Sequence, residues 1–166
     1  MSSTDAAAAM SEESEVASRT TQVFLNASLA GKGDRGRNAE LVKHIRSRGF
    51  RCLYVPQEEL PVGGKYTATQ IKNANVEAIR KADVVVSVLD NPGLGVAFEL
   101  SLALEIGKPV VLYRSSSQQD LGKMIEGVWE EFPPSRKAET IKGMLACLEH
   151  LAERNEEAAW SSRIRT

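Results

Sequence analysis

Residues 82–100 read ADVVVSVLDNPGLGVAFEL, and this stretch decides the predicted fold class. Apart from Ser87, residues 84–89 are all Val or Leu, which is typical of a parallel strand that is covered on both faces. Asp90-Asn91-Pro92-Gly93 are turn residues that end such a strand, and a helix is predicted at 96–106. The stretch therefore predicts a buried strand, a sharp turn and a helix, which together begin a βαβ unit.

The same alternation continues on both sides of this stretch. Further strands are predicted at 22–26, 51–55 and 110–113, and residues 131–132 are a candidate edge strand. Helices are predicted at 38–48, 67–81, 121–129 and 138–151. Strands that alternate with helices indicate parallel βαβ units. We therefore predict an α/β fold, a three-layer Rossmann-like or flavodoxin-like domain with a parallel sheet of four or five strands.

The composition is that of one globular domain without a strong charge. The chain has 166 residues, of which 42% are hydrophobic, enough for one sizeable core. We predict a domain at 21–152, between a disordered tail at 1–20 and a polar tail at 153–166. Lys and Arg total 21 against 22 Asp and Glu, so nucleic acid is not an expected partner. The apolar runs are strand-sized and the N-terminus lacks a secretory signal, so no membrane partner is expected either.

The two cysteines bear on compartment and metal binding. Cys52 and Cys147 stand far apart, without metal-ligand spacing around either. We therefore expect reduced thiols and no metal site, which favours the cytoplasm, with the nucleus as an alternative location.

Parallel sheets bind ligands beyond the carboxyl ends of their strands, so three loops, at 27–36, 90–95 and 114–120, are expected to carry the function. Glu99 follows the second of these loops, one turn into a helix. The residues alone leave two interpretations of Glu99 equally open. It is a ligand-facing carboxylate, or it is an acid that interacts with the positive end of the helix dipole.

The first loop contains the pattern G-x-G-x-x-G at Gly31, Gly33 and Gly36, after a strand and before a helix. This is the formal fingerprint of a dinucleotide site. The glycines begin several residues after the strand, however, which favours a backbone nest for a phosphate or a sugar. The dinucleotide site stays open as the less favoured alternative.

Residues 82–90, 93–100 and 107–112 resemble the nucleoside 2-deoxyribosyltransferase family. Residues 92–100 and 123–127 most resemble its branch of 2'-deoxynucleoside 5'-monophosphate N-glycosidases, and the resemblance spans about 23–128. It implies an enzyme that hydrolyses the N-glycosidic bond of a (deoxy)nucleoside 5'-monophosphate to free base and (deoxy)ribose 5-phosphate, without a cofactor. It also implies a homodimer whose sites are completed by the neighbouring subunit.

The resemblance gives roles to single residues. Glu99 matches the nucleophile at the anomeric carbon, where a carboxylate can trap or stabilise the positive charge that develops. Asn75 stands where the family usually has an aspartate, and would orient the sugar or Glu99; an amide can hydrogen-bond but cannot act as a base. The substrate-binding residues implied in the same way are Ala27, Ser28, Leu29, Ala30, Gly31, Lys32, Gly33, Gly93, Gly95, Gly122, Lys123 and Met124.

Three departures from the family pattern affect the expected substrate. Gly93 replaces an acid that nucleoside-specific transferases tend to use for the 5'-hydroxyl, which favours a nucleotide. The hydrolase branch has serines at 93 and 122, so phosphate contacts would come from backbone amides, Ser28, Lys32, Arg35 or Lys123. Phe24 replaces a common tyrosine. Base exchange between deoxynucleosides and a non-catalytic nucleotide sensor therefore stay open as alternatives.

Overall fold

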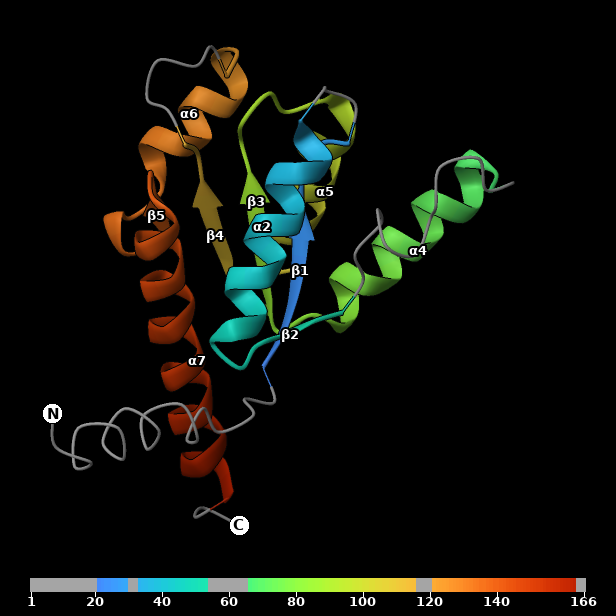
Figure 1. Cartoon of the computed structure of the whole chain (residues 1–166). Coiled ribbons are helices and arrows are strands. Elements are labelled where there is room, and N and C mark those ends of the chain that lie inside the picture. The colour runs from blue at the N-terminus through green and yellow to red at the C-terminus, as the bar shows by residue number, and fades with distance from the viewer. Residues whose placement is uncertain (1–20, 30–32, 54–65, 116–120, 164–166) are drawn as a thin grey trace, which may run out of the picture.

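The computed structural model describes residues 21–29, 33–53, 66–115 and 121–163, with side chains up to residue 155 (Figure 1). Within them, five parallel strands form one sheet in the order β2-β1-β3-β4-β5. Their bounds are β1 Gln22–Asn26, β2 Arg51–Cys52, β3 Val84–Val88, β4 Val110–Tyr113 and β5 Lys137–Ala138. The predicted parallel α/β fold is confirmed. The tail predicted at 1–20 lies outside the described residues.

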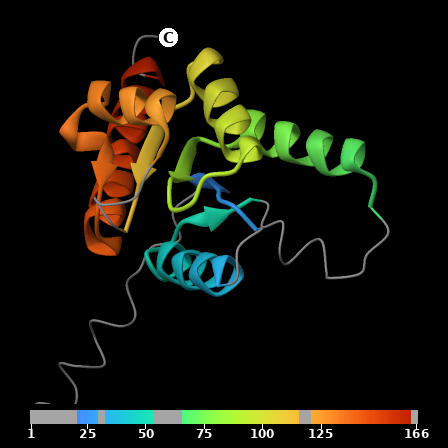
Figure 2. The ribbon, with the colours of Figure 1, turned by 90° about the horizontal axis from the view of Figure 1, so that it is seen from above.

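Helices cover both faces of the sheet, as the view from above shows (Figure 2). One face packs against α2 (Asp34–Ser47) and α7 (Ile141–Arg163). The other packs against α4 (Ala68–Lys81), α5 (Leu94–Glu105) and α6 (Lys123–Glu131). A short 3-10 helix, η1 (Pro134–Arg136), precedes β5. No described helix combines the length and the apolar composition that a membrane crossing requires.

Strand β3 is buried along its whole length, as its apolar sequence predicted. Successive side chains of a strand point to opposite faces. Val84, Val86 and Val88 accordingly pack towards α2 and α7, whereas Val85 packs towards α4 and α5. β3 therefore lies between two hydrophobic layers, with β1 and β4 paired on its two edges.

The prediction of an edge strand at 131–132 is wrong. Glu131 ends α6, and the amide of Phe132 still donates to the carbonyl of Val128 at 3.1 Å. The edge strand is β5, whose Lys137 and Ala138 pair with the end of β4. A segment of two residues, of which only Phe132 is β-prone, does not specify a strand when the preceding helix can continue into it.

Several helix bounds also differ from those predicted. Helix α2 begins at Asp34 instead of residue 38, because an acid in the first turn and its ion pair with Arg37 favour an earlier start. α5 begins two residues earlier than predicted, at Leu94. α7 continues to Arg163, beyond the predicted end at residue 151. For the strand predicted at 51–55, pairing is described for Arg51 and Cys52, and residues 54–55 lie outside the described part.

Replacing the N-cap of α4 tests how much that helix depends on its first turn. Thr67 Oγ1 accepts from the amide of Gln70 at 3.2 Å, and Gln70 Oε1 accepts from the amide of Thr67 at 2.9 Å. Thr67→Ala should lower the free energy of unfolding by about 1 kcal/mol, measured by urea denaturation, because the amide of Gln70 loses its partner. Thr67→Ser, which keeps the hydroxyl, should stay close to wild type. Equal stability of the Ala variant would contradict this account of the helix start.

Candidate active site

Helix α5, which carries Glu99, follows β3 and begins near the edge of the sheet at which β1 and β3 end (Figure 1). Strand β3 ends at Val88, and Gly93 is the N-cap of α5, so Glu99 falls in the second turn of that helix. Helix α4 packs against α5 and brings Asn75 to the same place. The structure therefore brings together the two residues predicted to be catalytic, although they come from different helices.

Asn75 and Glu99 form a hydrogen-bonded pair. Asn75 Nδ2 donates to Glu99 Oε1 at 2.6 Å, and both side chains are half-buried. Burial raises the pKa of Glu99 above its ordinary value of 4.5, and the hydrogen bond from Asn75 partly opposes this rise. The Oδ1 atom of Asn75 is buried and has no hydrogen-bond partner in the described part of the chain. The pair thus offers one oriented carboxylate and one unused carbonyl acceptor.

The first turn of α5 exposes bare backbone next to this pair. Gly93 makes no side-chain cap bond, and a Cβ added at Gly93 or Gly95 would meet nothing within 4 Å. Close packing is therefore not the reason for a glycine at either position. The first amides of a helix have no partner within the helix and favour an anion. The turn is chemically suited to an anionic group of a ligand.

The first loop is partly described, and its described part is held in place. Ser28 is buried, and its carbonyl accepts from Asn38 Nδ2 at 2.9 Å. Ala27 and Leu29 are half-buried beside it. Gly33 is the N-cap of α2 with a φ of 92°, a conformation that favours glycine. The predicted contacts at Ala30, Gly31 and Lys32 lie outside the described residues.

The dinucleotide alternative loses its structural support at Gly36. In that fingerprint the third glycine allows a helix and a strand to pack closely. Gly36 is instead an exposed residue within α2, and a Cβ added there would meet nothing within 4 Å. Arg35, a candidate phosphate contact, is exposed on the same helix.

The residues predicted at the start of α6 face solvent in the single chain. Gly122 is the N-cap of α6 with a φ of 70°, and Met124 is 85% exposed. Lys123 is exposed as well. This part of the predicted site is available to a ligand or to a second chain.

The sequence reasoning missed a buried ionic contact that joins the three loops. Asp90, 2% exposed, accepts from the backbone amide of Ser115 at 2.7 Å. Its Oδ2 lies 3.9 Å from Arg37 Nε, and Arg37 Nη2 lies 3.0 Å from Asp34 Oδ1. The signal for this contact in the sequence is an acid directly after a buried strand, at a position where the sequence by itself predicts only a turn. Asp90 thus links the ends of β3 and β4 to the first turn of α2.

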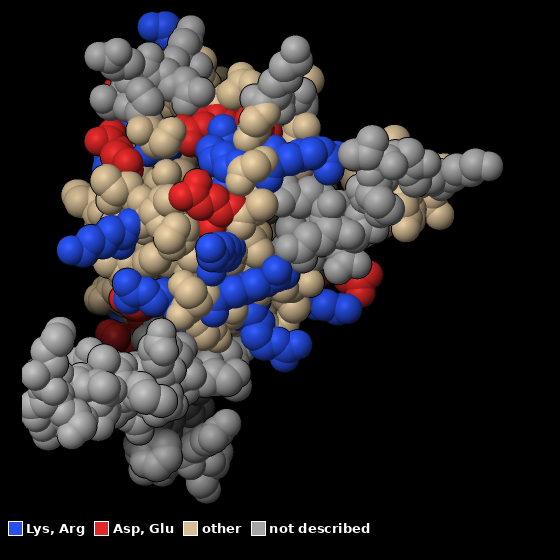
Figure 3. Space-filling view, viewed as in Figure 1, with Lys and Arg blue, Asp and Glu red and all other residues tan. Residues whose placement is uncertain are grey.

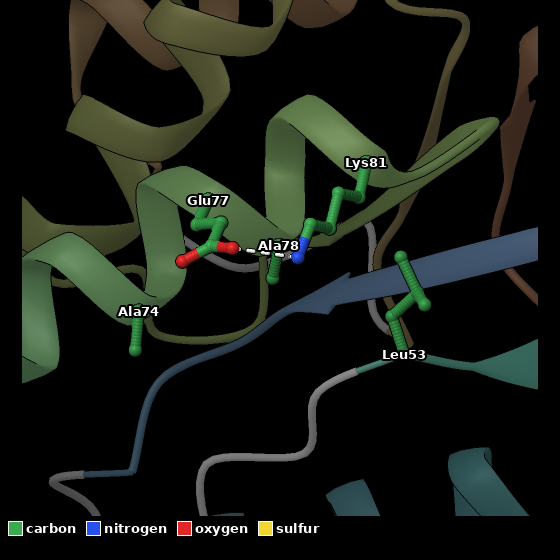
Figure 4. Close-up of a pocket in the computed structure, with 5 residues that line it drawn as sticks. All are labelled: Leu53, Ala74, Glu77, Ala78 and Lys81. Atoms are coloured by element: carbon green, nitrogen blue, oxygen red, sulfur yellow. Dashed lines mark hydrogen bonds and ion pairs between the residues drawn. The ribbon is translucent and has the colours of Figure 1, made fainter.

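A shallow hollow of about 310 Å³ lies between α4 and Leu53 (Figure 4). Its described lining consists of Leu53 and, on α4, Ala74, Glu77, Ala78 and Lys81. Glu77 and Lys81 form an ion pair of 2.6 Å along its rim. The lining includes neither Glu99 nor Asn75, so we do not place the reaction in this hollow.

Charged side chains are mixed over the surface that Figure 3 shows. Basic side chains spread over the face where α2 lies, with acidic ones among them. Among the described residues, no group of three or more His, Cys, Asp or Glu side chains could hold a metal ion.

The sequence model of the family described as nucleoside 2-deoxyribosyltransferase matches residues 23–147. The chain belongs to this family. The fold of this chain is also similar to that of solved structures. The CMP N-glycosidase from Clostridium botulinum, 18% identical, superposes with a TM-score of 0.53 over 78% of this chain and 98% of that one. The 2-deoxyribosyltransferase from Bacillus psychrosaccharolyticus, also 18% identical, gives 0.51 over 60% and 76%. These likenesses show the shared fold.

Curated relatives within the nucleoside 2-deoxyribosyltransferase family are named as hydrolases. A putative 2'-deoxynucleoside 5'-phosphate N-hydrolase 1 from Thermofilum pendens is 31% identical over 118 residues, 67% of this chain and 81% of the relative. The 5-hydroxymethyl-dUMP N-hydrolase of Mus musculus is 32% identical over 109 residues, 63% of each protein, so the chain spans just under two thirds of that relative. The predicted family is confirmed, and its members are enzymes that act on N-glycosidic bonds.

Glu99→Gln should make the protein more stable at neutral pH. The folded chain raises the pKa of Glu99, so the contribution of its protonated form to stability is complete below pH 4.5 and is lost as the pH rises through the raised pKa. Gln resembles the protonated form and can still accept from Asn75. In urea denaturation the variant should exceed wild type at about pH 7, and the difference should shrink near about pH 4.

Glu77→Gln is a control, because the pKa of Glu77 is shifted in the opposite direction to that of Glu99. The ion pair with Lys81 lowers the pKa of Glu77, which is fully exposed, so this variant should gain nothing at neutral pH. A Glu99→Gln variant that is less stable than wild type at neutral pH would contradict the direction of the Glu99 shift.

Asn75→Asp should raise the pH at which Glu99 loses its proton. The substitution replaces a donor by a second carboxyl group at the 2.6 Å contact, and two such groups cannot easily both be ionised. The last proton of the pair should leave at least about one pH unit above the wild-type midpoint, measured by 13C NMR of the carboxyl carbons. Asn75→Leu, which removes the donor without adding charge, should give a smaller rise. An Asp variant that titrates at or below wild type would refute this account of the pair.

Proposed function

We propose that the chain hydrolyses the N-glycosidic bond of a (deoxy)nucleoside 5'-monophosphate to free base and (deoxy)ribose 5-phosphate. One observation carries the proposal: a half-buried carboxylate, Glu99, is held by Asn75 at the ligand edge of this family's fold. The N-hydrolase names of the relatives support the same reaction class.

In the proposed reaction Glu99 is the nucleophile. One of its oxygens attacks the anomeric carbon as the bond from that carbon to the base nitrogen breaks, and the bonding electrons leave with the base. The base takes a proton from water, because the amide of Asn75 donates hydrogen bonds but is not an acid. The hydroxide that remains from this water then cleaves the glycosyl ester, which releases the sugar phosphate and restores the carboxylate. Asn75 holds the attacking oxygen in place and offers its unpaired Oδ1 to a sugar hydroxyl.

The phosphate contacts are proposed to come chiefly from backbone. The first turn of α5 carries Gly93 and Gly95 and has no side-chain cap, so its amides can face an anion. The loop from Ala27 to Gly33, with Ser28, would also contact the sugar and phosphate. Gly93 also leaves no acid at this point to repel a 5'-phosphate. A nucleotide is therefore the proposed substrate rather than a nucleoside.

We also propose that the protein acts as a homodimer. Leu94 and Phe98, on the helix that carries Glu99, are 92% and 55% exposed, and Met124 at the start of α6 is 85% exposed. Leu94 and Phe98 are neighbours on one face of α5, and adjoining exposed apolar side chains favour an interaction surface. A second copy that covered them would bring its own Gly122, Lys123 and Met124 towards the site. A cytoplasmic location is proposed with it, in keeping with two free cysteines, Cys52 and Cys147.

The deciding experiment is chromatography of free base after incubation with a panel of nucleoside and deoxynucleoside monophosphates. Wild type should release base, and Glu99→Ala should lose activity by on the order of 10³-fold or more, because removal of a nucleophile costs at least that much. Glu99→Gln serves as a matched variant of unchanged shape. Base release that survives both substitutions would rule out Glu99 as the nucleophile.

The same experiment separates the two alternatives. With an added second base, transfer of the sugar to that base would indicate base exchange, the reaction for which the family is named. Nucleotide binding without any release of base would indicate a sensor, the alternative that Asn75 in place of an acid suggests.

A further inference from the structure

Asn26 is a buried polar residue at the ligand edge that the proposed reaction does not yet use. It is the last residue of β1 and is 0% exposed. Val23 and Leu25 of β1 pack towards α2 and α7, whereas Phe24 packs towards α4 and α5. Because side chains alternate along a strand, Asn26 shares the face of Phe24. Asn26 therefore faces the helix layer that contains Glu99.

The carboxamide of Asn26 makes two hydrogen bonds across this layer. Its Nδ2 donates to the backbone carbonyl of Val96 at 2.9 Å and to Ser87 Oγ, on its register partner in β3, at 3.1 Å. A carbonyl can only accept, so the contact with Val96 sets the orientation of the amide. Oδ1 is buried and has no hydrogen-bond partner in the described part of the chain. A buried amide that is only half satisfied costs stability that an apolar residue here would avoid.

The helix that receives this bond has little local support at its start. Gly93 at the N-cap makes no side-chain bond, and Gly95 lies in the first turn, where glycine is the weakest helix former after proline. The space around both glycines is open, so packing does not hold them either. The bond from Asn26 to the Val96 carbonyl is therefore a tertiary contact that holds the first turn. Val96 and Glu99 are three residues apart, which makes them neighbours on the helix surface.

We propose that Asn26 is a positioning residue: by holding the carbonyl of Val96, it fixes the first turn of α5 and so places the Glu99 carboxylate against Asn75. The effect on rate rests on the proposed function. Asn26 does not touch the reacting atoms in this role. It acts through the helix, from the end of β1, on a carboxylate that must be held in one place to attack the sugar.

Asn26→Leu tests the proposal, because it removes the donor with little change in volume. We expect kcat to fall by about 10- to 100-fold, since a small misplacement of a reacting group costs that much, with KM within about threefold of wild type. The midpoint of Glu99 in 13C NMR titration should also rise, because the Asn75 hydrogen bond that lowers its pKa is weakened. If Asn26 instead acted by holding the neighbouring substrate-binding loop that contains Ser28, the substitution would change KM and leave kcat close to wild type.

Two control variants separate positioning from general loss of stability. Ser87→Ala removes the longer of the two Asn26 contacts and keeps the bond to Val96, so kcat should stay within about threefold of wild type. Ile45→Val weakens the core on the opposite face of the sheet, where Ile45 is fully buried in α2. It should lower the unfolding temperature and leave both kcat and the Glu99 midpoint unchanged.

The outcomes distinguish this inference from the proposed function. If wild type releases base and Asn26→Leu keeps its kcat and its Glu99 midpoint, the positioning role is overturned and the reaction stands. If wild type releases no base, the proposed function fails, and the NMR midpoint of Glu99 still decides whether Asn26 positions it. If the Leu variant does not fold, Asn26→Ser serves in its place, because its shorter side chain also loses the bond to Val96. It should shift the midpoint in the same direction, and an unshifted midpoint overturns the proposal.

Discussion

Complete burial of β3 is the constraint on which the rest of the structure depends. A parallel strand buried on both faces needs helices over each face and a strand on each edge, and here β1 and β4 pair with it. In the resulting order, β2-β1-β3-β4-β5, the chain adds β2 on one side of β1 and β3 to β5 on the other, so the strand order reverses between β1 and β3. Ligand sites of open α/β sheets lie at such a reversal, beyond the carboxyl ends of the strands. Asn26 and Glu99 both lie at this point.

The pair of Glu99 and Asn75 gives the candidate site an unusual balance of charge and hydrogen bonding. Burial opposes ionisation of Glu99, whereas the hydrogen bond donated by the Asn75 amide favours it and a second acid would oppose it. Where the family usually has an aspartate, this chain therefore keeps one titrating group instead of two. The same amide has an unused oxygen, which can accept a hydrogen bond without changing the charge of the site.

Residue patterns were sufficient to predict the central strands of the sheet and insufficient to predict its edge strand. The nearly continuous apolar runs of β3 and β4 predicted strands that the structure contains almost residue for residue. The prediction of the edge strand at 131–132 was wrong because the actual edge strand, Lys137 and Ala138, is a strand only through its pairing with β4. Helix α2 began earlier than its apolar spacing indicated because Asp34 and Arg37 stabilise an extra turn of polar residues. In the site, Glu99 and Asn75 came from the family resemblance, whereas the contacts that Asn26 and Asp90 make were not predicted.

The sequence by itself determined the buried strand, the turn at Asp90–Gly93 and the placement of Glu99 early in the following helix, because each depends on residues that are neighbours along the chain. Only the tertiary structure decided which polar side chains meet there. The bond of Asn75 to Glu99 spans 24 residues, that of Ser115 to Asp90 spans 25, and that of Asn26 to Val96 spans 70. No local pattern encodes such contacts, since they exist only once β1, β3 and β4 have paired in parallel and α4 and α5 have packed over the same face.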